Sequence, residues 1–246
     1  MRSFVHYIPI VTSVFAIWFG FVLVQRYRAR GGLHHLWWAI GVFAYAAGTI
    51  TESLTTLIGW HEPLFRAWYI SGALLGGFPL AQGTVYLLFS RKTADRLTVI
   101  VLSVVAVAAT CVLLTPIDMS QVEPYRLSGR VMEWQWVRAF SPFINLYAVI
   151  FLIGGAIYSA LKFRKIPEMR SRTIGNWFIA IGAILPGIGG TATRMGHVEV
   201  LYVTELVGII LIYIGFRFAT TTAPVAATAP KPRLGQDTTP LSVDAP

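Results

Sequence analysis

Residues 97–115 read LTVIVLSVVAVAATCVLLT, a run without a single charged side chain. As an α-helix, this run is about 28 Å long at roughly 1.5 Å per residue. The hydrocarbon core of a bilayer is about 30 Å thick, so the run is long enough to cross it. Arg96 and Pro116 limit the run on its two sides. The run therefore predicts a transmembrane helix and indicates the class of the whole chain.

The rest of the chain has the same apolar character. Of the 246 residues, 55% are hydrophobic and 13% are charged, and the mean hydropathy is +0.63. In an ordinary soluble domain about a quarter of the residues are charged. The net charge of +9 comes from basic residues that lie between the apolar runs and form no basic domain, so nucleic acid is not an expected partner. The expected partner is the lipid bilayer.

Seven apolar runs are long enough to be membrane spans. They are residues 8–25, 36–58, 64–89, 97–115, 140–161, 174–190 and 200–218. The expected fold is all-α, a bundle of seven transmembrane helices in one domain of residues 1–219. Residues 220–246 are rich in Thr, Ala and Pro and poor in hydrophobic side chains, which is typical of a disordered tail.

The basic residues predict the orientation of these spans. Most of the 20 Lys and Arg residues, including every lysine, fall in the connections after the first, third, fifth and seventh runs. Cytoplasmic connections carry the excess of Lys and Arg. The N-terminus is therefore expected outside the cytoplasm and the C-terminus inside, in a multi-pass protein of the inner cell membrane. The basic connection 162–172 is a candidate contact for a partner protein.

The first three and the last three runs form a candidate internal repeat. Residues 8–89 then correspond to 140–218, with the helix at 97–115 as the linker. The matched positions share one constant shift: Ala39, Ile40, Gly41 and Gly48 fall on Ala180, Ile181, Gly182 and Gly189. Because these residue types are common in membrane spans, chance similarity is the open alternative. The arrangement is similar to that of sugar carriers of the SWEET and PQ-loop families, although no Pro-Gln pair begins the first or fifth run. Its topology also resembles that of opsins and G-protein-coupled receptors. Neither likeness implies a substrate.

The third run carries Arg66, Trp68, Tyr69 and Pro79, and so resembles the third helix of microbial rhodopsins. A retinal Schiff base needs a lysine in the last span, however, and all lysines of this chain lie outside the spans. The resemblance therefore implies no retinal cofactor. The histidines lie near the ends of the runs and do not form the pair that would hold a haem between helices. His197 and Glu199 lack a third metal ligand, and Cys111 is the only cysteine, so no metal site and no cofactor is predicted.

Ionisable and polar residues inside spans are candidates for function, because lipid does not solvate them. Thr49, Glu52, Ser53 and Thr56 share one face of the second span, since they are spaced i, i+3, i+4, i+7. Other polar and aromatic residues occupy the same outer layer, namely Arg66, Trp68, Tyr69, Asn145, Arg194 and Glu205. We expect these residues to form an outward-facing pocket for a small polar ligand, with Glu52 close to Arg66 or Arg194. The alternative is a set of structural ion pairs.

The sixth run contains Pro186 followed by Gly187, Gly189 and Gly190, which predicts a broken helix. Broken spans occur where they line a cavity, as in carriers. The hypothesis that follows is a small-solute carrier. A ligand sensor or accessory subunit that acts through a partner protein is the first alternative, and a membrane enzyme acting on lipid or quinone is the second. No catalytic set of residues is identified for an enzyme.

Overall fold

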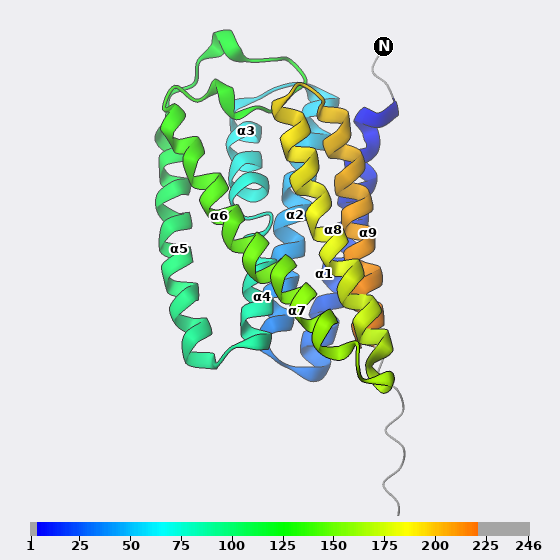
Figure 1. Ribbon diagram of the computed structural model, residues 1–246. Coiled ribbons are helices and arrows are strands. Elements are labelled where there is room, and N and C mark those ends of the chain that lie inside the picture. Colours follow the sequence, from blue (N-terminus) through cyan, green and yellow to red (C-terminus); the bar gives the residue numbers. More distant parts are fainter. Residues whose placement is uncertain (1–3, 221–246) are drawn as a thin grey trace, which may run out of the picture.

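A computed structural model of the protein describes residues 4–220, and within this range it is a helical bundle (Figure 1). The helices run roughly along the long axis of the bundle, and α1 begins at the upper end of Figure 1 while α9 ends at the lower one. Their bounds are α1 Ile8–Arg30, α2 Leu33–Ile58, α3 Glu62–Trp68, α4 Phe78–Leu88, α5 Arg91–Leu114, α6 Phe140–Ala148, α7 Gly154–Phe163, α8 Arg170–Arg194 and α9 Val198–Thr220. The tail expected at 220–246 lies outside the described residues, except for Thr220, which ends α9.

Within residues 4–220, five helical segments are long and apolar enough to cross a membrane, judged by length and composition. They contain α1, α5, α6 with α7, α8 and α9. α2 is as long as these helices, but its second half carries a row of Thr, Ser and Glu side chains. The remaining expected span is interrupted and is made of two shorter helices, α3 and α4. An all-helical protein with several long apolar helices is therefore established, and a count of seven spans rests on α2 and on α3 with α4.

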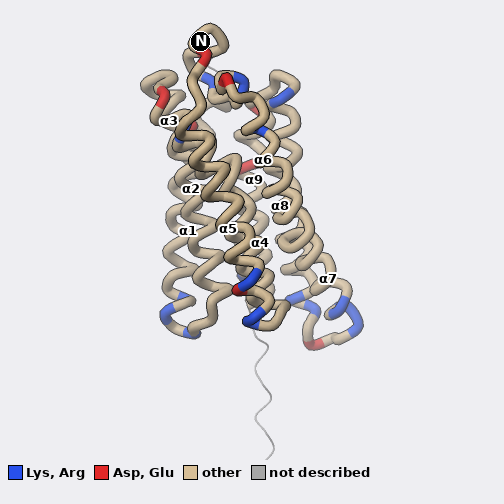
Figure 2. The backbone as a smooth tube through the Cα atoms, turned by 90° about the vertical axis from the view of Figure 1, so that its left-hand side faces the viewer, with Lys and Arg blue, Asp and Glu red and all other residues tan. Residues whose placement is uncertain are grey.

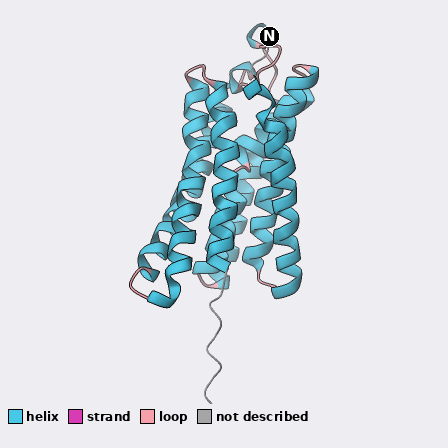
Figure 3. Cartoon of the chain, turned by 90° about the vertical axis from the view of Figure 1, so that its right-hand side faces the viewer, coloured by secondary structure: helices cyan, strands magenta, loops and turns pink. Residues whose placement is uncertain are grey.

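The interruption between α3 and α4 lies near the middle of the bundle. After α3 the chain forms a π-helix, η2 (Tyr69–Leu74), and then a bend at residues 75–77 before α4 begins. Figure 3 shows this bend as a short loop inside the bundle. Gly72, Gly76 and Gly77 favour it, because glycine lowers helix stability, and Pro79 then suits the first turn of α4.

The break expected at Pro186 is absent, because α8 runs without interruption from Arg170 to Arg194. Proline removes the N–H that would bond to the carbonyl four residues earlier, here that of Gly182. In this chain Gly208 of α9 packs directly on that carbonyl, so that a Cβ on Gly208 would lie 2.7 Å from the Gly182 oxygen. The close neighbouring helix therefore covers the freed carbonyl, and α8 continues past the proline.

The connections at the two ends of the bundle differ in charge. We call the lower end of Figure 1 the basic end; it carries residues 31–32, 89–90 and 164–169, together with the end of α9. Figure 2 shows Lys and Arg gathered there and few charges along the middle of the helices. The upper end carries the long connection 115–139, which folds into short 3-10 turns and buries Val131, Met132 and Val137 against α3 and α5.

Candidate functional site

The polar face of α2 points into the bundle, as its spacing predicts. Thr49, Glu52, Ser53 and Thr56 are all buried, and Glu52 has only 4% of its surface exposed. The hydroxyl groups on this face are held locally: Ser13 of α1 donates to Thr49 Oγ1 at 2.9 Å, and Ser53 donates to the Thr49 carbonyl at 2.7 Å. Glu52 is therefore the acidic group that this face presents to its neighbours.

Glu52 is bound by a tryptophan. The indole Nε1 of Trp68, the last residue of α3, donates to Glu52 Oε1 at 2.9 Å. This contact requires α2 and η2 to approach closely, and a Cβ on Gly48 would lie 3.2 Å from the Cα of Gly72. Glycine at both positions allows this approach. The break after Trp68 therefore begins beside the buried carboxyl group.

A second carboxyl group, that of Glu205 on α9, lies beside Glu52. The two side chains are close enough to interact. Oε2 of each is enclosed and has no hydrogen-bond partner among the described residues. Carboxylate oxygens only accept hydrogen bonds, so a bond between two such oxygens forms only when one of the groups carries a proton. The arrangement is therefore a pair of neighbouring carboxyl groups, each with one oxygen that lacks a donor.

Aromatic side chains surround this carboxyl pair. The Tyr45 hydroxyl of α2 donates to the backbone carbonyl of Glu205 at 2.9 Å, which ties α2 to α9 at this level. Tyr202, one turn before Glu205, is buried with 4% of its surface exposed. The pair thus lies in an environment of low polarity, in which charged and hydrogen-bonding interactions are stronger than in water.

The arginine expected beside Glu52 lies elsewhere. The Arg66 guanidinium bonds to Glu62 at 2.7 Å and donates to the carbonyls of Val112 and Thr115 at the end of α5. Arg66 and Trp68 are two residues apart on α3, so they point to different sides of the helix. Trp68 takes the side that faces Glu52, and Arg66 therefore fastens α3 to α5.

Arg194 also belongs to a different part of the molecule. It ends α8 at the upper end, its side chain is exposed, and its backbone carbonyl accepts a bond from Arg130 of the long connection at 3.4 Å. Neither of the two arginines is among the hydrogen-bond partners described for Glu52. The expected cluster of acids and arginines is thus replaced by the Glu52–Glu205 pair.

The remaining predicted residues support the interrupted span. Asn145 and Ser141 of α6 both donate to the carbonyl of Ala73 in η2, at 3.4 and 3.0 Å. They supply donors where the π-helix and the bend disturb the regular helical bonding. Tyr69 is buried and packs edge-on against Trp68, with ring centroids 6.0 Å apart. Asn145 therefore positions the break and is not part of the carboxyl pair.

A cavity of about 490 Å³ lies at the basic end, between α1, α2, α4, α7, α8 and α9. Its interior reaches Val42 of α2, less than one turn before Tyr45. On α9 it reaches Ile212, about two turns after Glu205. Tyr45, Glu52 and Glu205 are not among the residues that line the cavity. The expected pocket was at the opposite end of the bundle. No sequence pattern predicts this cavity, because its lining comes from six helices far apart in the chain.

The sequence and the structure were both compared with known proteins. No protein-family model matches the chain, and neither a curated protein nor a solved structure is significantly similar to it.

Proposed function

We propose that the chain is a multi-pass protein of the inner cell membrane with seven spans, its N-terminus outside and its C-terminus in the cytoplasm. Five long apolar helices support several crossings, and α2 and the α3–η2–α4 segment complete the seven. The excess of Lys and Arg at the basic end supports the orientation. We also propose that residues 8–89 and 140–218 are repeats joined by α5. An alignment of related chains, in which both triplets keep the same positions, is the check on the repeat.

We further propose that the protein carries a small polar solute across the membrane together with a proton. The observation that supports this proposal is the Glu52–Glu205 pair, for which the described residues provide no ion-pair partner. Neighbouring carboxyl groups inside a membrane bundle occur in the proton relays of pumps and transporters. The proton that the pair holds can leave when one side of the membrane is connected to it and return from the other side. No bond other than an O–H bond is made or broken in this cycle.

The interrupted span beside the pair gives the movement that such a cycle needs. Trp68, which binds Glu52, ends α3, and the bend at residues 75–77 separates α3 from α4. A half-helix that shifts at this bend carries Trp68 with it and so changes the surroundings of Glu52. Broken helices have this role in known carriers.

The test is proton movement in proteoliposomes that contain a pH-sensitive dye. An inward solute gradient is imposed with sugars and with amino acids in turn, and the internal pH is recorded. We expect at least one of these solutes to cause proton movement in the natural chain. Glu52→Gln and Glu205→Gln should abolish it, while Glu199→Gln, a change at an exposed glutamate on the same helix as Glu205, should leave it intact.

The same variants separate the alternatives. A glutamine amide can donate to the remaining carboxylate as the protonated acid does, so both Gln variants should fold normally. Proton movement that persists in Glu52→Gln contradicts the role of the pair. If no solute moves protons, a ligand sensor or an accessory subunit becomes the better reading. Chemical change of added lipid or quinone would instead identify an enzyme.

A further inference from the structure

The cavity at the basic end has a charged mouth and an apolar interior. Its mouth carries Arg26 and Arg30 from α1, Lys162 from α7 and Arg172 from α8. The described residues that line it include no Asp or Glu. Deeper in, the lining consists of side chains of the main hydrophobic core, among them Phe19, Leu23, Val42, Leu80, Leu152 and Ile212. The two ends of the cavity therefore suit the two ends of an amphiphile.

Among the described residues, no acidic side chain neutralises the basic residues at the mouth. In the described part of the molecule, the ion pairs involve other side chains, and none joins a carboxylate to Arg26, Arg30, Lys162 or Arg172. Arg26 lies over the Phe216 ring at 5.5 Å, and Arg172 lies over the Phe163 ring at 6.0 Å. The rings hold both guanidinium groups at the mouth and leave their N–H edges to other acceptors.

Arg26 also has a donor without an acceptor. Its Nε is buried and has no hydrogen-bond partner, and its Nη2 makes only a long bond of 3.4 Å to the Thr220 carbonyl. A buried donor that lacks a partner is unfavourable. A carboxylate or phosphate oxygen placed at the mouth would accept from Nε and Nη2 together, which is the paired geometry that arginine favours.

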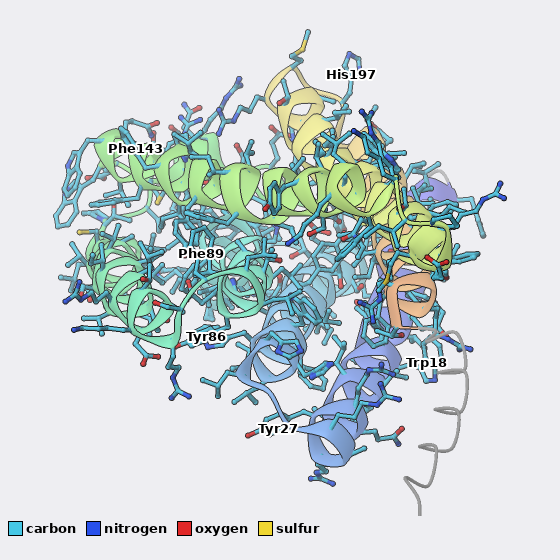
Figure 4. The ribbon with its side chains drawn as sticks, turned by 60° about the horizontal axis from the view of Figure 1, so that its bottom comes forward. Trp18, Tyr27, Tyr86, Phe89, Phe143 and His197 are labelled. Carbon is cyan, nitrogen blue, oxygen red and sulfur yellow. The ribbon has the colours of Figure 1, made fainter. Side chains whose placement is uncertain are left out.

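We propose that this cavity binds a single-chain anionic amphiphile, with its carboxylate or phosphate head on Arg26 and Arg172 and its acyl chain in the apolar interior. The volume of about 490 Å³ lies in the range of pockets that enclose drug-sized ligands, so it suits one acyl chain and not a whole diacyl lipid. Figure 4 turns this end of the bundle toward the reader, with Tyr27 of α1 and Phe89 after α4 labelled. The inference concerns binding alone and does not depend on proton-linked carriage at Glu52 and Glu205.

The experiment uses the full chain in nanodiscs of neutral phosphatidylcholine, with empty discs subtracted. Dodecanoate, dodecyl phosphate, dodecanol and inorganic phosphate are titrated, and binding is measured by calorimetry. We expect both anionic amphiphiles to bind, and dodecanol and inorganic phosphate to bind at least about tenfold more weakly, since each lacks one half of the interaction. Tighter binding of dodecanoate or of dodecyl phosphate identifies the head group.

Two arginine variants and two matched controls test the mouth. Arg26→Gln and Arg172→Gln should each lower the affinity for the anionic amphiphiles about tenfold. Arg28→Gln and Arg170→Gln alter exposed neighbours that do not line the cavity, and they should leave the affinity unchanged. Binding of dodecanol as tight as that of dodecanoate, or equal losses in the variants and their controls, would overturn the proposal. If Arg26→Gln fails to fold, Arg172→Gln decides the outcome.

Discussion

The hydrogen bond from Trp68 to Glu52 is the contact on which the site depends, and it can be removed without changing much volume. Trp68→Phe keeps an aromatic ring but leaves Glu52 Oε1 without its donor. We expect the free energy of unfolding to fall by about 1–3 kcal/mol, the usual cost of an unpaired buried acceptor. Unfolding in mixed detergent micelles measures the change.

Trp60→Phe is the matched control for this substitution. The Trp60 Nε1 is buried and has no hydrogen-bond partner, so the substitution removes a donor that satisfies nothing. Its stability should stay within a few tenths of a kcal/mol of the natural chain or rise slightly. Equal losses for the two substitutions would mean that ring size, and not the bond to Glu52, accounts for the effect.

His34 lies before the proposed membrane segment of α2, at the mouth of the cavity. Burial, followed by charge repulsion from His35 and Arg26, lowers the pKa of its imidazole from 6.5 to about 4. His34 is therefore neutral at pH 7 and gains its proton only as the pH falls toward 4. Removing the positive charge in Arg26→Gln should raise this pKa, because the protonated imidazole is then less disfavoured.

NMR titration of labelled histidine checks this prediction. Arg28→Gln is the control, since Arg28 is not among the groups that lower the His34 pKa. A His34 pKa near 6.5 in the natural chain, or one that does not change in Arg26→Gln, would contradict the assignment of His34 to this basic mouth.

At the scale of the helices, the sequence predicts where each helix lies in the chain better than it predicts whether that helix is interrupted. Apart from the run 64–89, which is interrupted at residues 75–77, the apolar runs lie within observed helical segments to within a residue at their ends. The i, i+3, i+4, i+7 pattern correctly places the buried face of α2. The effect of Pro186 was predicted wrongly, because it depends on Gly208 of a neighbouring helix. The interruption before α4 was not predicted, because close helix packing explains glycines such as Gly72, Gly76 and Gly77 equally well.

The packing of α8 on α9 gives a prediction at this scale. A Cβ at Gly182 would lie 2.6 Å from the Gly208 carbonyl oxygen, which is backbone and has little freedom to move. Gly182→Leu should therefore separate the two helices and lower stability by about 1–3 kcal/mol or more. Gly187, on the same helix, has nothing within 4 Å of its ideal Cβ. Gly187→Leu should be nearly neutral, and thermal unfolding of both variants distinguishes local packing from a general effect of leucine.

At the scale of the whole molecule, the pairing of Glu52 with Glu205 could not be predicted from the sequence. Both residues were identified as buried acids at similar depth, but which helices are neighbours depends on the packing of all of them together. A carboxyl group in a span was expected to find an arginine, and Arg66 instead bonds to Glu62 and to α5. Composition predicts that these acids lie in apolar surroundings. Which side chains become their partners depends on how the helices pack.

The proposed orientation of the molecule is tested by labelling. In a Cys111→Ser background, a cysteine at Gln121 should react with a membrane-impermeant maleimide in intact cells, and one at Lys165 should react only after the membrane is opened. Both positions are exposed and lie at opposite ends of the bundle, in the long connection and in the basic loop. The reverse pattern would place the basic end outside.

The contacts of α5 determine when, during synthesis of the chain, the two halves of the interrupted span can be held in place. Arg66 of α3 donates to carbonyls at the end of α5, while Gln82 of α4 donates to Ala94 and Thr98 near its start, so α5 joins both halves of the interrupted span. Chains are made from the N-terminus, and α3 and α4 therefore leave the ribosome before their common partner. A nascent chain that stops before Val112 still lacks the backbone carbonyls that accept from Arg66. Trp68 should consequently reach its final position beside Glu52 only once α5 has been synthesised.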